Sequence, residues 1–158
     1  MPITIVFVCH GNICRSPMAE MVLKEMVRQK GLSDRFSISS RAATTEEIGE
    51  DTYPPAKRTL DAHHIPHPKR KASLITGEDY ERADYIIAMD QENLHDLAYL
   101  THQDPDKKIS LLLSWAGEKR DVADPWFTND YEKTYDDVVK GCRGILDKLT
   151  GMPGAPCV

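Results

Sequence analysis

A cysteine and an arginine lie six positions apart in the segment Cys9-His10-Gly11-Asn12-Ile13-Cys14-Arg15-Ser16. Gly11 and Asn12 tolerate positive φ, so this segment can turn successive backbone amides inward and form a concave anion nest. An anion held there would meet the thiol of Cys9 at one end and the guanidinium of Arg15 at the other. The amides, the guanidinium and the positive end of a following helix all favour the thiolate. We therefore expect a nucleophilic sulfur aimed at a bound phosphoryl group.

The segment Asp124-Pro125-Trp126-Phe127 supplies what such a nest lacks. In-line attack by Cys9 would give a phosphocysteine, which needs an acid for the leaving group and then a base for water. Asp124 can serve as both in turn. Trp126 and Phe127 offer aromatic walls suited to a phenyl ring. The pattern predicts hydrolysis of an aryl phosphate, with no cofactor and no metal.

The elements around these residues predict a parallel α/β sheet. Apolar β-branched runs indicate buried strands over residues 3–8, 85–89 and 109–113. Residues 36–39 alternate in polarity and indicate a short strand, the second of four along the chain. Helical periodicity is seen over residues 17–30, from Pro54 to about residue 64, and in the stretch after Asp90. A last helix is expected from residue 129 or 130 to residue 149. Ser16 is expected to cap the first helix, with Pro17 at its first position. We expect an open four-stranded parallel sheet in flavodoxin-like order, with helices on both faces.

The chemically interesting side chains all follow the ends of these strands. Cys9, Ser40 and Asp90 come after the first three strands, and Asp124 lies in the loop after the fourth. Open parallel sheets bind ligands beyond the carboxyl ends of their strands, where the strand order reverses. These four residues are therefore expected to converge on one site.

Composition sets the class of protein. The 158 residues are 41% hydrophobic and carry a net charge of −5, which predicts one globular domain over residues 1–150 and a tail over 151–158. The negative charge argues against nucleic acid or an anionic membrane as partner, and no apolar run approaches the ~20 residues of a membrane span. With no charged leader pattern and four cysteines that match no disulfide framework, we expect a cytoplasmic protein, monomeric or at most a weak dimer.

One stretch is rich in histidine and another is rich in lysine and arginine, and neither is expected to be catalytic. Pro66 interrupts the helical register between His63 and His67, and no carboxylate or cysteine completes a set of metal ligands with His63, His64 and His67. We therefore expect hydrogen-bonding roles for these histidines rather than a metal site. The run Lys69-Arg70-Lys71 is expected to be a solvated face, with attraction of acidic substrates as the alternative.

With these motifs in place, the segment from Val8 through Arg15 to Glu20 resembles the signature of the low-molecular-weight protein tyrosine phosphatases. The similarity extends, in order and approximate spacing, through Ile38-Ser39-Ser40, Gly49, Pro54-Pro55-Ala56, Met89-Asp90-Gln91-Glu92-Asn93-Leu94 and Asp124-Pro125 to the last helix. It implies phosphotyrosine proteins and small aryl phosphates as substrates.

The resemblance also implies a role for each site residue. Cys9 would be the nucleophile, Arg15 the phosphate clamp and Asp124 the general acid, with the phosphate held by Cys9, His10, Gly11, Asn12, Ile13, Cys14 and Arg15. Asn12 would hold the loop's strained shape, supported by Ser40 and Asp90. Ser16 would donate to the sulfur of Cys9, and His67 would lie near Ser16.

The sequence departs from the family pattern at three places. His10 stands where an apolar or small residue is more usual, and Ser39 where Asp is frequent, which puts the network of His67 in doubt. Trp126 and Phe127 replace a tyrosine pair of many animal members. Cys14 fits either a small packing residue or a resolving thiol that traps oxidised Cys9 as a disulfide.

Other activities remain open on this fold. A phosphoarginine phosphatase would resemble this chain but tends to have Thr where Ile13 stands. An arsenate reductase would need further cysteines around residues 80–90, and this stretch has none. A phosphoryl carrier would have no need of Asp124, and a purely structural phosphate-binding module would have no need of Cys9.

Overall fold

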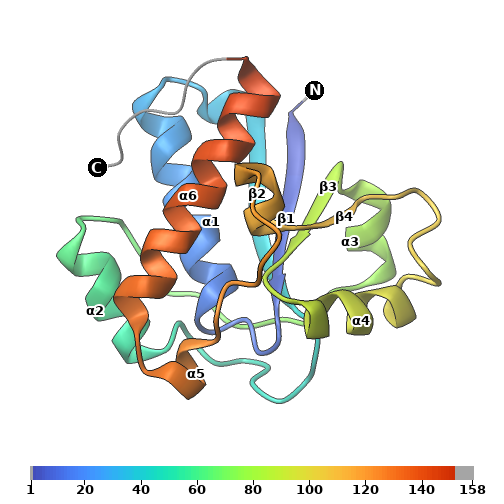
Figure 1. Ribbon diagram of the computed structural model, residues 1–158, viewed down its shortest axis with the longest axis horizontal. Coiled ribbons are helices and arrows are strands. Elements are labelled where there is room, and N and C mark those ends of the chain that lie inside the picture. Colours follow the sequence, from blue (N-terminus) through green and yellow to red (C-terminus); the bar gives the residue numbers. More distant parts are fainter. Residues whose placement is uncertain (1, 152–158) are drawn as a thin grey trace.

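Four parallel strands form the centre of the computed structural model, which describes residues 2–151. The strands are β1 (Ile3–Cys9), β2 (Phe36–Ala42), β3 (Tyr85–Ala88) and β4 (Ile109–Leu111), in the order β2-β1-β3-β4 (Figure 1). Ile3 of β1 pairs with Phe36 of β2, and Ile5 pairs with Tyr85 of β3. The predicted open parallel sheet and its flavodoxin-like order are confirmed.

Helices cover both faces of this sheet. The helices α1 (Arg15–Gln29) and α6 (Tyr131–Thr150) pack together on one face, with α2 (Pro54–Ala62) against α6. On the other side lie α3 (Gly77–Arg82) and α4 (Gln91–Leu100), as Figure 1 shows. The remaining elements are short: α5 (Pro125–Thr128) and the 3₁₀ turns η1 (Ser33–Arg35) and η2 (Leu112–Ala116). The sequence analysis did not expect α3, α5 or the two 3₁₀ turns.

The strand β1 is buried on both faces, which explains its unbroken apolar run. Ile5 and Phe7 point into the core beneath α1 and α6, whereas Val6 and Val8 point into the second core beside α4. Alternate residues of a strand face opposite sides of the sheet, so both sides need apolar residues here. Burial on both faces fixes the register of β1 and hence the position of Cys9 at its end.

The start of α1 differs from the expectation. The helix begins at Arg15, its N-cap is Cys14 without a side-chain hydrogen bond, and Ser16 lies inside the first turn. The hydroxyl of Ser16 contacts the sulfur of Cys9 instead of capping the helix. Pro17 is tolerated because the first turn of a helix has no acceptor for its missing N–H.

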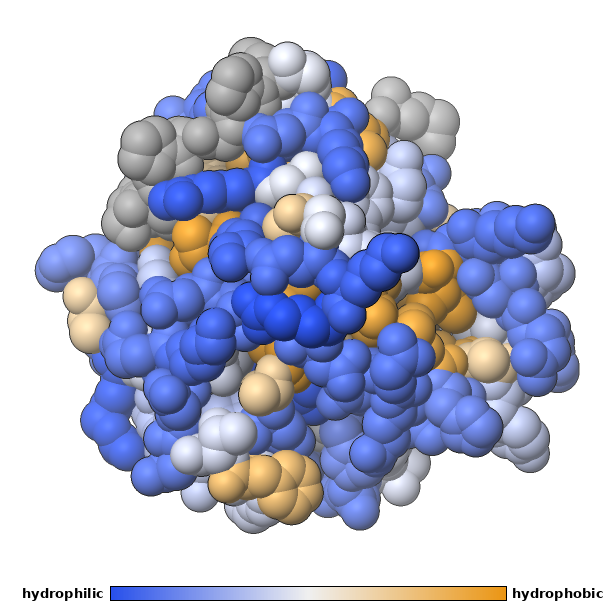
Figure 2. Space-filling view, in the orientation of Figure 1, coloured by the Kyte–Doolittle hydropathy of each residue, from blue (hydrophilic) through white to orange (hydrophobic). Residues whose placement is uncertain are grey.

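The molecular surface in the view of Figure 2 is mainly hydrophilic, with apolar residues in scattered groups. None of the helices between residues 2 and 151 combines the length and apolar character needed to cross a membrane. Gly151 ends α6 with a φ of 71°. The rest of the expected tail, residues 152–158 with Cys157, lies outside the described residues.

Two glycines in α6 allow the helix to approach η2 closely. A Cβ added to Gly144 would lie 2.2 Å from the carbonyl oxygen of Trp115, and one added to Gly141 would lie 2.4 Å from Cγ of Leu112. By helix propensity alone, a glycine inside a helix is only destabilising. In the structure, the missing side chains make room for the neighbouring turn.

We expect Gly144→Ala to lower the free energy of unfolding by about 1–3 kcal/mol through overpacking. Helix propensity alone predicts the opposite sign, a gain of about 1 kcal/mol. Urea denaturation would decide between the two. Gly77→Ala is the matched control, because a Cβ there meets nothing within 4 Å. A Gly144→Ala protein as stable as the parent would contradict the steric account.

Candidate active site

The candidate site lies at the point where the strand order reverses. From β1 the chain passes to β2 on one side and returns to β3 on the other, so that Cys9 and Asp90 lie at adjacent strand ends. A cavity of about 770 Å³ opens there. Its lining includes Cys9, His10, Gly11, Ile13, Cys14, Arg15, Glu46, Glu47, Asp90, Glu92, Asn93, Asp124, Trp126 and Phe127.

The loop after β1 holds its carbonyl groups to the outside and leaves its amides free. The carbonyl oxygens of Cys9, His10 and Ile13 accept from backbone N–H groups of residues 43, 44 and 53. None of the hydrogen bonds among residues 2–151 uses a backbone N–H of residues 10–14 as its donor. Enclosed N–H groups without acceptors are rare in folded proteins. These five amides therefore fit an anion as their common acceptor.

The turn of this loop differs in one detail from the expectation. Only Asn12 has a positive φ, of 60°, and Gly11 does not. Gly11 matters instead because a Cβ there would approach Cγ of Glu47 to 3.1 Å. The glycine thus allows close packing, and the strained conformation falls on the asparagine.

The side chain of Asn12 ties the loop to three other segments. Its Nδ2 donates to Oγ of Ser16 at 2.8 Å and to Oγ of Ser40 at 3.0 Å. Its Oδ1 accepts from Nη2 of Arg70 at 2.6 Å and from the backbone N–H of Ser73 at 3.2 Å. This fully buried amide uses both its donor and its acceptor groups, which compensates for the strained backbone.

The sulfur of Cys9 receives two contacts from the first turn of α1. Its Sγ lies 3.0 Å from Oγ of Ser16 and 3.4 Å from the backbone N–H of the same residue. Both groups can donate to a thiolate, and the positive end of α1 adds to their effect. The geometry therefore places two hydrogen-bond donors where they can stabilise negative charge on this sulfur.

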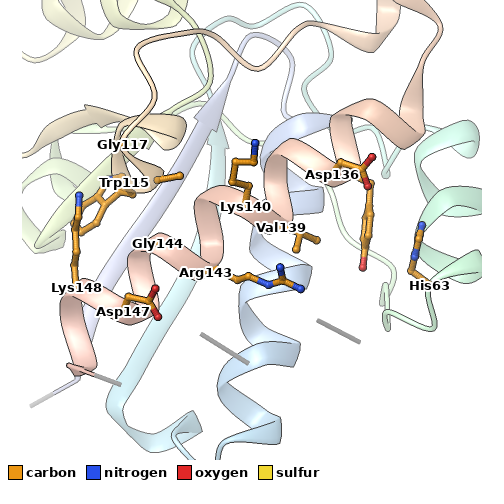
Figure 3. A pocket seen from close by; sticks show the side chains of 12 residues that line it. His63, Trp115, Gly117, Asp136, Val139, Lys140, Arg143, Gly144, Asp147 and Lys148 are labelled. Atoms are coloured by element: carbon orange, nitrogen blue, oxygen red, sulfur yellow. The ribbon is translucent and has the colours of Figure 1, made fainter. Parts of the chain in front are cut away.

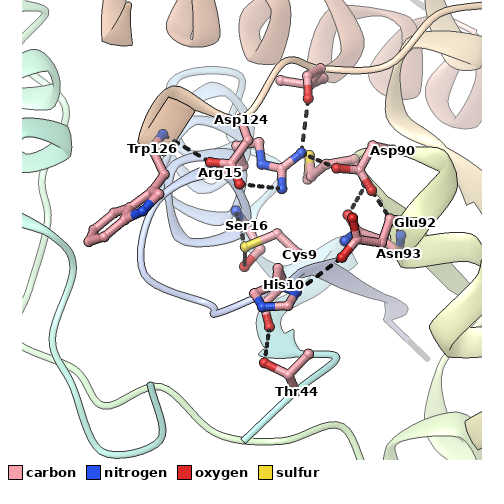
Figure 4. A network of polar contacts seen from close by, with 12 residues as sticks. Cys9, His10, Arg15, Ser16, Thr44, Asp90, Glu92, Asn93, Asp124 and Trp126 are labelled. Carbon is pink, nitrogen blue, oxygen red and sulfur yellow. Dashed lines mark hydrogen bonds and ion pairs between the residues drawn. The ribbon is translucent and has the colours of Figure 1, made fainter. Parts of the chain in front are cut away.

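Arg15 is a buried cation at the floor of the cavity, with 2% of its side chain exposed. Its Nη1 donates to Oδ2 of Asp90 at 2.6 Å and to the carbonyl oxygen of Val122 at 2.9 Å, and its Nη2 lies 3.4 Å from Oδ2 of Asp124 (Figure 4). Burial alone would lower the pKa of Arg15. The charge of Cys9 and the contacts with the two carboxylates outweigh burial and raise this pKa, so the guanidinium stays charged.

Asp124 is held at the cavity by a helix cap. Its Oδ1 accepts the backbone N–H of Trp126 at 3.0 Å, so the side chain caps α5, while Pro125 occupies the first position of that helix. The second oxygen, Oδ2, is the one that faces Arg15. A quarter of the side chain is exposed, which gives water access to this carboxyl group.

The two aromatic rings beside the cavity differ in their packing. Trp126 packs against Tyr53 with 5.2 Å between ring centroids, and Phe127 is 83% exposed. Ile13 completes the wall next to the nest, because it lines the same cavity. Ile13, Trp126 and Phe127 thus line one and the same cavity.

Two supporting residues lie elsewhere than expected. His67 pairs with Oδ1 of Asp61 at 2.5 Å and makes no hydrogen bond to Ser16, whose hydroxyl instead contacts Asn12 and Cys9. Arg70, three residues further along the same loop, contacts the phosphate loop instead, by donating to Oδ1 of Asn12. Asp90 supports the guanidinium of the loop rather than Asn12. It also caps α4 by accepting the backbone N–H of Asn93.

Several cavity residues have no counterpart in the sequence analysis. Glu46, Glu47 and Glu92 add carboxylates to the mouth, and His10 pairs through Nε2 with Glu46. The basic run that contains Arg70 was the available signal for a residue close to the phosphate loop. The acidic residues carry no such signal, because they lie in a polar loop and on an exposed helix turn.

A second cavity of about 820 Å³ lies between α6, η2 and α2 (Figure 3). Its lining includes Trp115, Tyr135, Lys140, Arg143 and Lys148, and none of the predicted site residues. We therefore place the chemistry in the cavity around Cys9.

Comparisons with known proteins agree with this geometry. The family model for low molecular weight phosphotyrosine protein phosphatase matches residues 4–152. The low molecular weight phosphotyrosine protein phosphatase of Sus scrofa is 38% identical, covering 92% of this chain and 95% of its own. The solved structure of YfkJ from Bacillus subtilis superposes with a TM-score of 0.92 at 30% identity, covering 96% of each chain. The drosophila arginine phosphatase DARP gives 0.84 at 29% identity, covering 91% of this chain and 96% of its own. The chain belongs to the low molecular weight phosphotyrosine protein phosphatase family.

Proposed function

We propose that this protein hydrolyses phosphotyrosine in proteins, and small aryl phosphates, through a phosphocysteine intermediate and without a cofactor. The observation that carries the proposal is the loop after Cys9, whose backbone amides at residues 10–14 donate to no acceptor among residues 2–151, beside the buried guanidinium of Arg15 in the same cavity. Donors of this kind suit the three equatorial oxygens of a phosphoryl group in transfer. Asp124 lies 3.4 Å from the guanidinium of Arg15 and lines the same cavity.

In the first step the thiolate of Cys9 attacks phosphorus, and the bond from phosphorus to the phenolic oxygen breaks. The carboxyl proton of Asp124 passes to that oxygen, so the leaving group departs as a neutral phenol.

In the second step a water molecule attacks the phosphorus of the phosphocysteine. The carboxylate of Asp124 accepts the proton of this water, and the sulfur leaves as a thiolate. The hydroxyl of Ser16, 3.0 Å from the sulfur, donates to the developing charge. Inorganic phosphate is then released, and the enzyme returns to its starting state.

The walls of the cavity support an aromatic leaving group. The braced ring of Trp126 and the apolar side chain of Ile13 can pack on the two sides of a phenyl ring. The likeness to an arginine phosphatase keeps phosphoarginine as the second candidate. The carboxylates of Glu46 and Glu92 at the mouth would suit a guanidinium, whereas Ile13 offers it no hydrogen bond.

We expect the purified protein, in buffer with a chelator, to hydrolyse a phosphotyrosine peptide at least about tenfold faster than phosphoarginine in kcat/KM, a difference of about 1.4 kcal/mol in the barrier. Phosphate release measured on both substrates gives the ratio. A ratio below one would select the arginine activity, and release from neither substrate would reject the proposed function.

For its setting, we propose that the enzyme acts in the cytoplasm as a monomer on phosphotyrosine proteins, without nucleic acid or membrane as partner. The net charge of −5 supports the absence of nucleic acid and membrane as partners, because it disfavours binding to anionic surfaces.

We also propose that Cys14 protects Cys9 from irreversible oxidation. Peroxide would oxidise the thiolate of Cys9 to a sulfenic acid, and Cys14 would then attack that sulfur, forming a disulfide and releasing water. Burial and the charge of Cys9 raise the pKa of Cys14 to about 12. The second of these causes disappears once Cys9 is a neutral sulfenic acid, so oxidation itself makes Cys14 a better nucleophile.

After brief peroxide treatment at pH 8, we expect mass spectrometry to find a peptide linked through Cys9 and Cys14, and a thiol reductant to restore activity. The Cys14→Ser protein is expected to lose activity irreversibly under the same treatment, because its sulfenic acid is oxidised further. Equal recovery of the two proteins would count against the protective role.

A further inference from the structure

The mechanism leaves the side chain of His10 without a role. Its ring lies at the mouth of the catalytic cavity, about one third exposed, with Nε2 paired to Glu46. The other nitrogen, Nδ1, is enclosed and has no hydrogen-bond partner. The carboxylate oxygen Oε1 of Glu92 lies 3.6 Å from this Nδ1, too far for a hydrogen bond.

Asp96 completes a group of three possible metal ligands. One atom each from His10, Glu92 and Asp96 lies within 4.8 Å of the other two. Glu92 and Asp96 are four residues apart on α4 and so share one face of the helix. Two ligands bound tetrahedrally to zinc at about 2.0–2.1 Å lie roughly 3.4 Å from each other. The gap of 3.6 Å is therefore suited to two ligands of one ion.

Glu46 gives the histidine the orientation that a ligand needs. Histidine ligands commonly donate their other ring N–H to a carboxylate, which fixes the tautomer and raises the basicity of the metal-binding nitrogen. The pairing of Nε2 with Glu46 matches this arrangement and leaves the lone pair of Nδ1 on the side of Glu92. One imidazole, two carboxylates and an open fourth position suit Zn²⁺.

We propose that His10, Glu92 and Asp96 form a zinc site at the mouth of the catalytic cavity, and that zinc bound there inhibits the enzyme reversibly. The open position of the ion would bind a phosphate oxygen and hold the substrate away from Cys9. A metal was not expected from the sequence, where only the histidines at 63, 64 and 67 were considered as ligands. Only the inhibitory effect rests on the proposed function, since binding does not require activity.

Calorimetric titration of ZnCl₂ into metal-free Cys9→Ser protein tests the site without the competing thiolate of Cys9. We expect one zinc ion per chain, and at least tenfold weaker binding in the double variants that add His10→Asn or Asp96→Asn. His95→Asn in the same background is the matched control, because His95 is an exposed residue of α4 outside the cluster. It should bind zinc as the parent does.

Absence of zinc binding by the Cys9→Ser protein, or binding that ignores both ligand substitutions, would overturn the site. Inhibition of p-nitrophenyl phosphate turnover by ZnCl₂ gives the second measurement. The Asp96→Asn enzyme should match the parent in chelator and need at least tenfold more zinc for half inhibition. Unchanged sensitivity would mean that zinc acts elsewhere, for example on Cys9, and would overturn the inhibitory role. A protein without turnover would reject the proposed function and leave the calorimetric result valid.

Discussion

Cys9→Ser is expected to reduce turnover of p-nitrophenyl phosphate by about 10⁴-fold or more, the scale on which removal of a nucleophile acts in enzymes that use covalent catalysis. A serine hydroxyl in this position stays protonated at neutral pH, and no general base among the described residues contacts Cys9, whose side-chain partner is Ser16. The stabilised charge is therefore lost together with the sulfur.

The measurement is steady-state release of p-nitrophenol in the presence of chelator. The control is binding of inorganic phosphate to the same variant by calorimetry, which should persist because the free amides and Arg15 are untouched. Loss of turnover with retained phosphate binding assigns the chemistry to Cys9. Turnover that survives the substitution would falsify the mechanism.

Asp124→Ala is expected to lower turnover in proportion to how much the leaving group needs a proton. For phenyl phosphate we expect a loss of about 10²–10⁴-fold, the typical contribution of general acid catalysis. For p-nitrophenyl phosphate the loss should be smaller in the first step, because p-nitrophenolate leaves without protonation. Comparison of kcat/KM for the two esters measures this difference directly.

The cap that Asp124 provides to α5 needs a separate control. Asparagine can cap a helix through its side-chain oxygen but cannot donate a carboxyl proton, so Asp124→Asn keeps the cap and removes the acid. It should lose as much activity as Asp124→Ala. Asp121→Ala, an exposed carboxylate of the same loop, should lose none. Recovery of activity in Asp124→Asn would mean that the cap, rather than the proton, is what matters.

The fold was predictable because local pattern and global topology agree. The apolar run of β1, the glycine and asparagine after it and the periodic α1 together place Cys9 at a strand end. Asp90 follows β3 at the neighbouring strand end, as the topology of parallel sheets predicts. Ser40, expected after the second strand, lies instead inside β2 and reaches the loop by accepting from Nδ2 of Asn12.

Some differences from the structure had a signal in the sequence. Thr76 and Asp79 form a capping box, which indicates the start of α3. The start of α1 was misplaced because Ser16 has the chemistry of a cap but contacts a sulfur instead. The basic run Lys69-Arg70-Lys71 was a signal for its loop, but the contact of Arg70 with Asn12 could not be foreseen, because that loop has no periodicity and its path depends on distant contacts.

The ties of Asn12 to Ser16, Ser40 and Arg70 have a thermodynamic consequence for ligand binding. These contacts within the chain fix the shape of the nest, so the loop loses little conformational entropy when a phosphate binds. Preorganisation of this kind leaves more of the interaction energy for the ligand itself. Phosphate binding should therefore have only a small ordering penalty, and the amides of residues 10–14 should be as rigid in the free enzyme as in its complex.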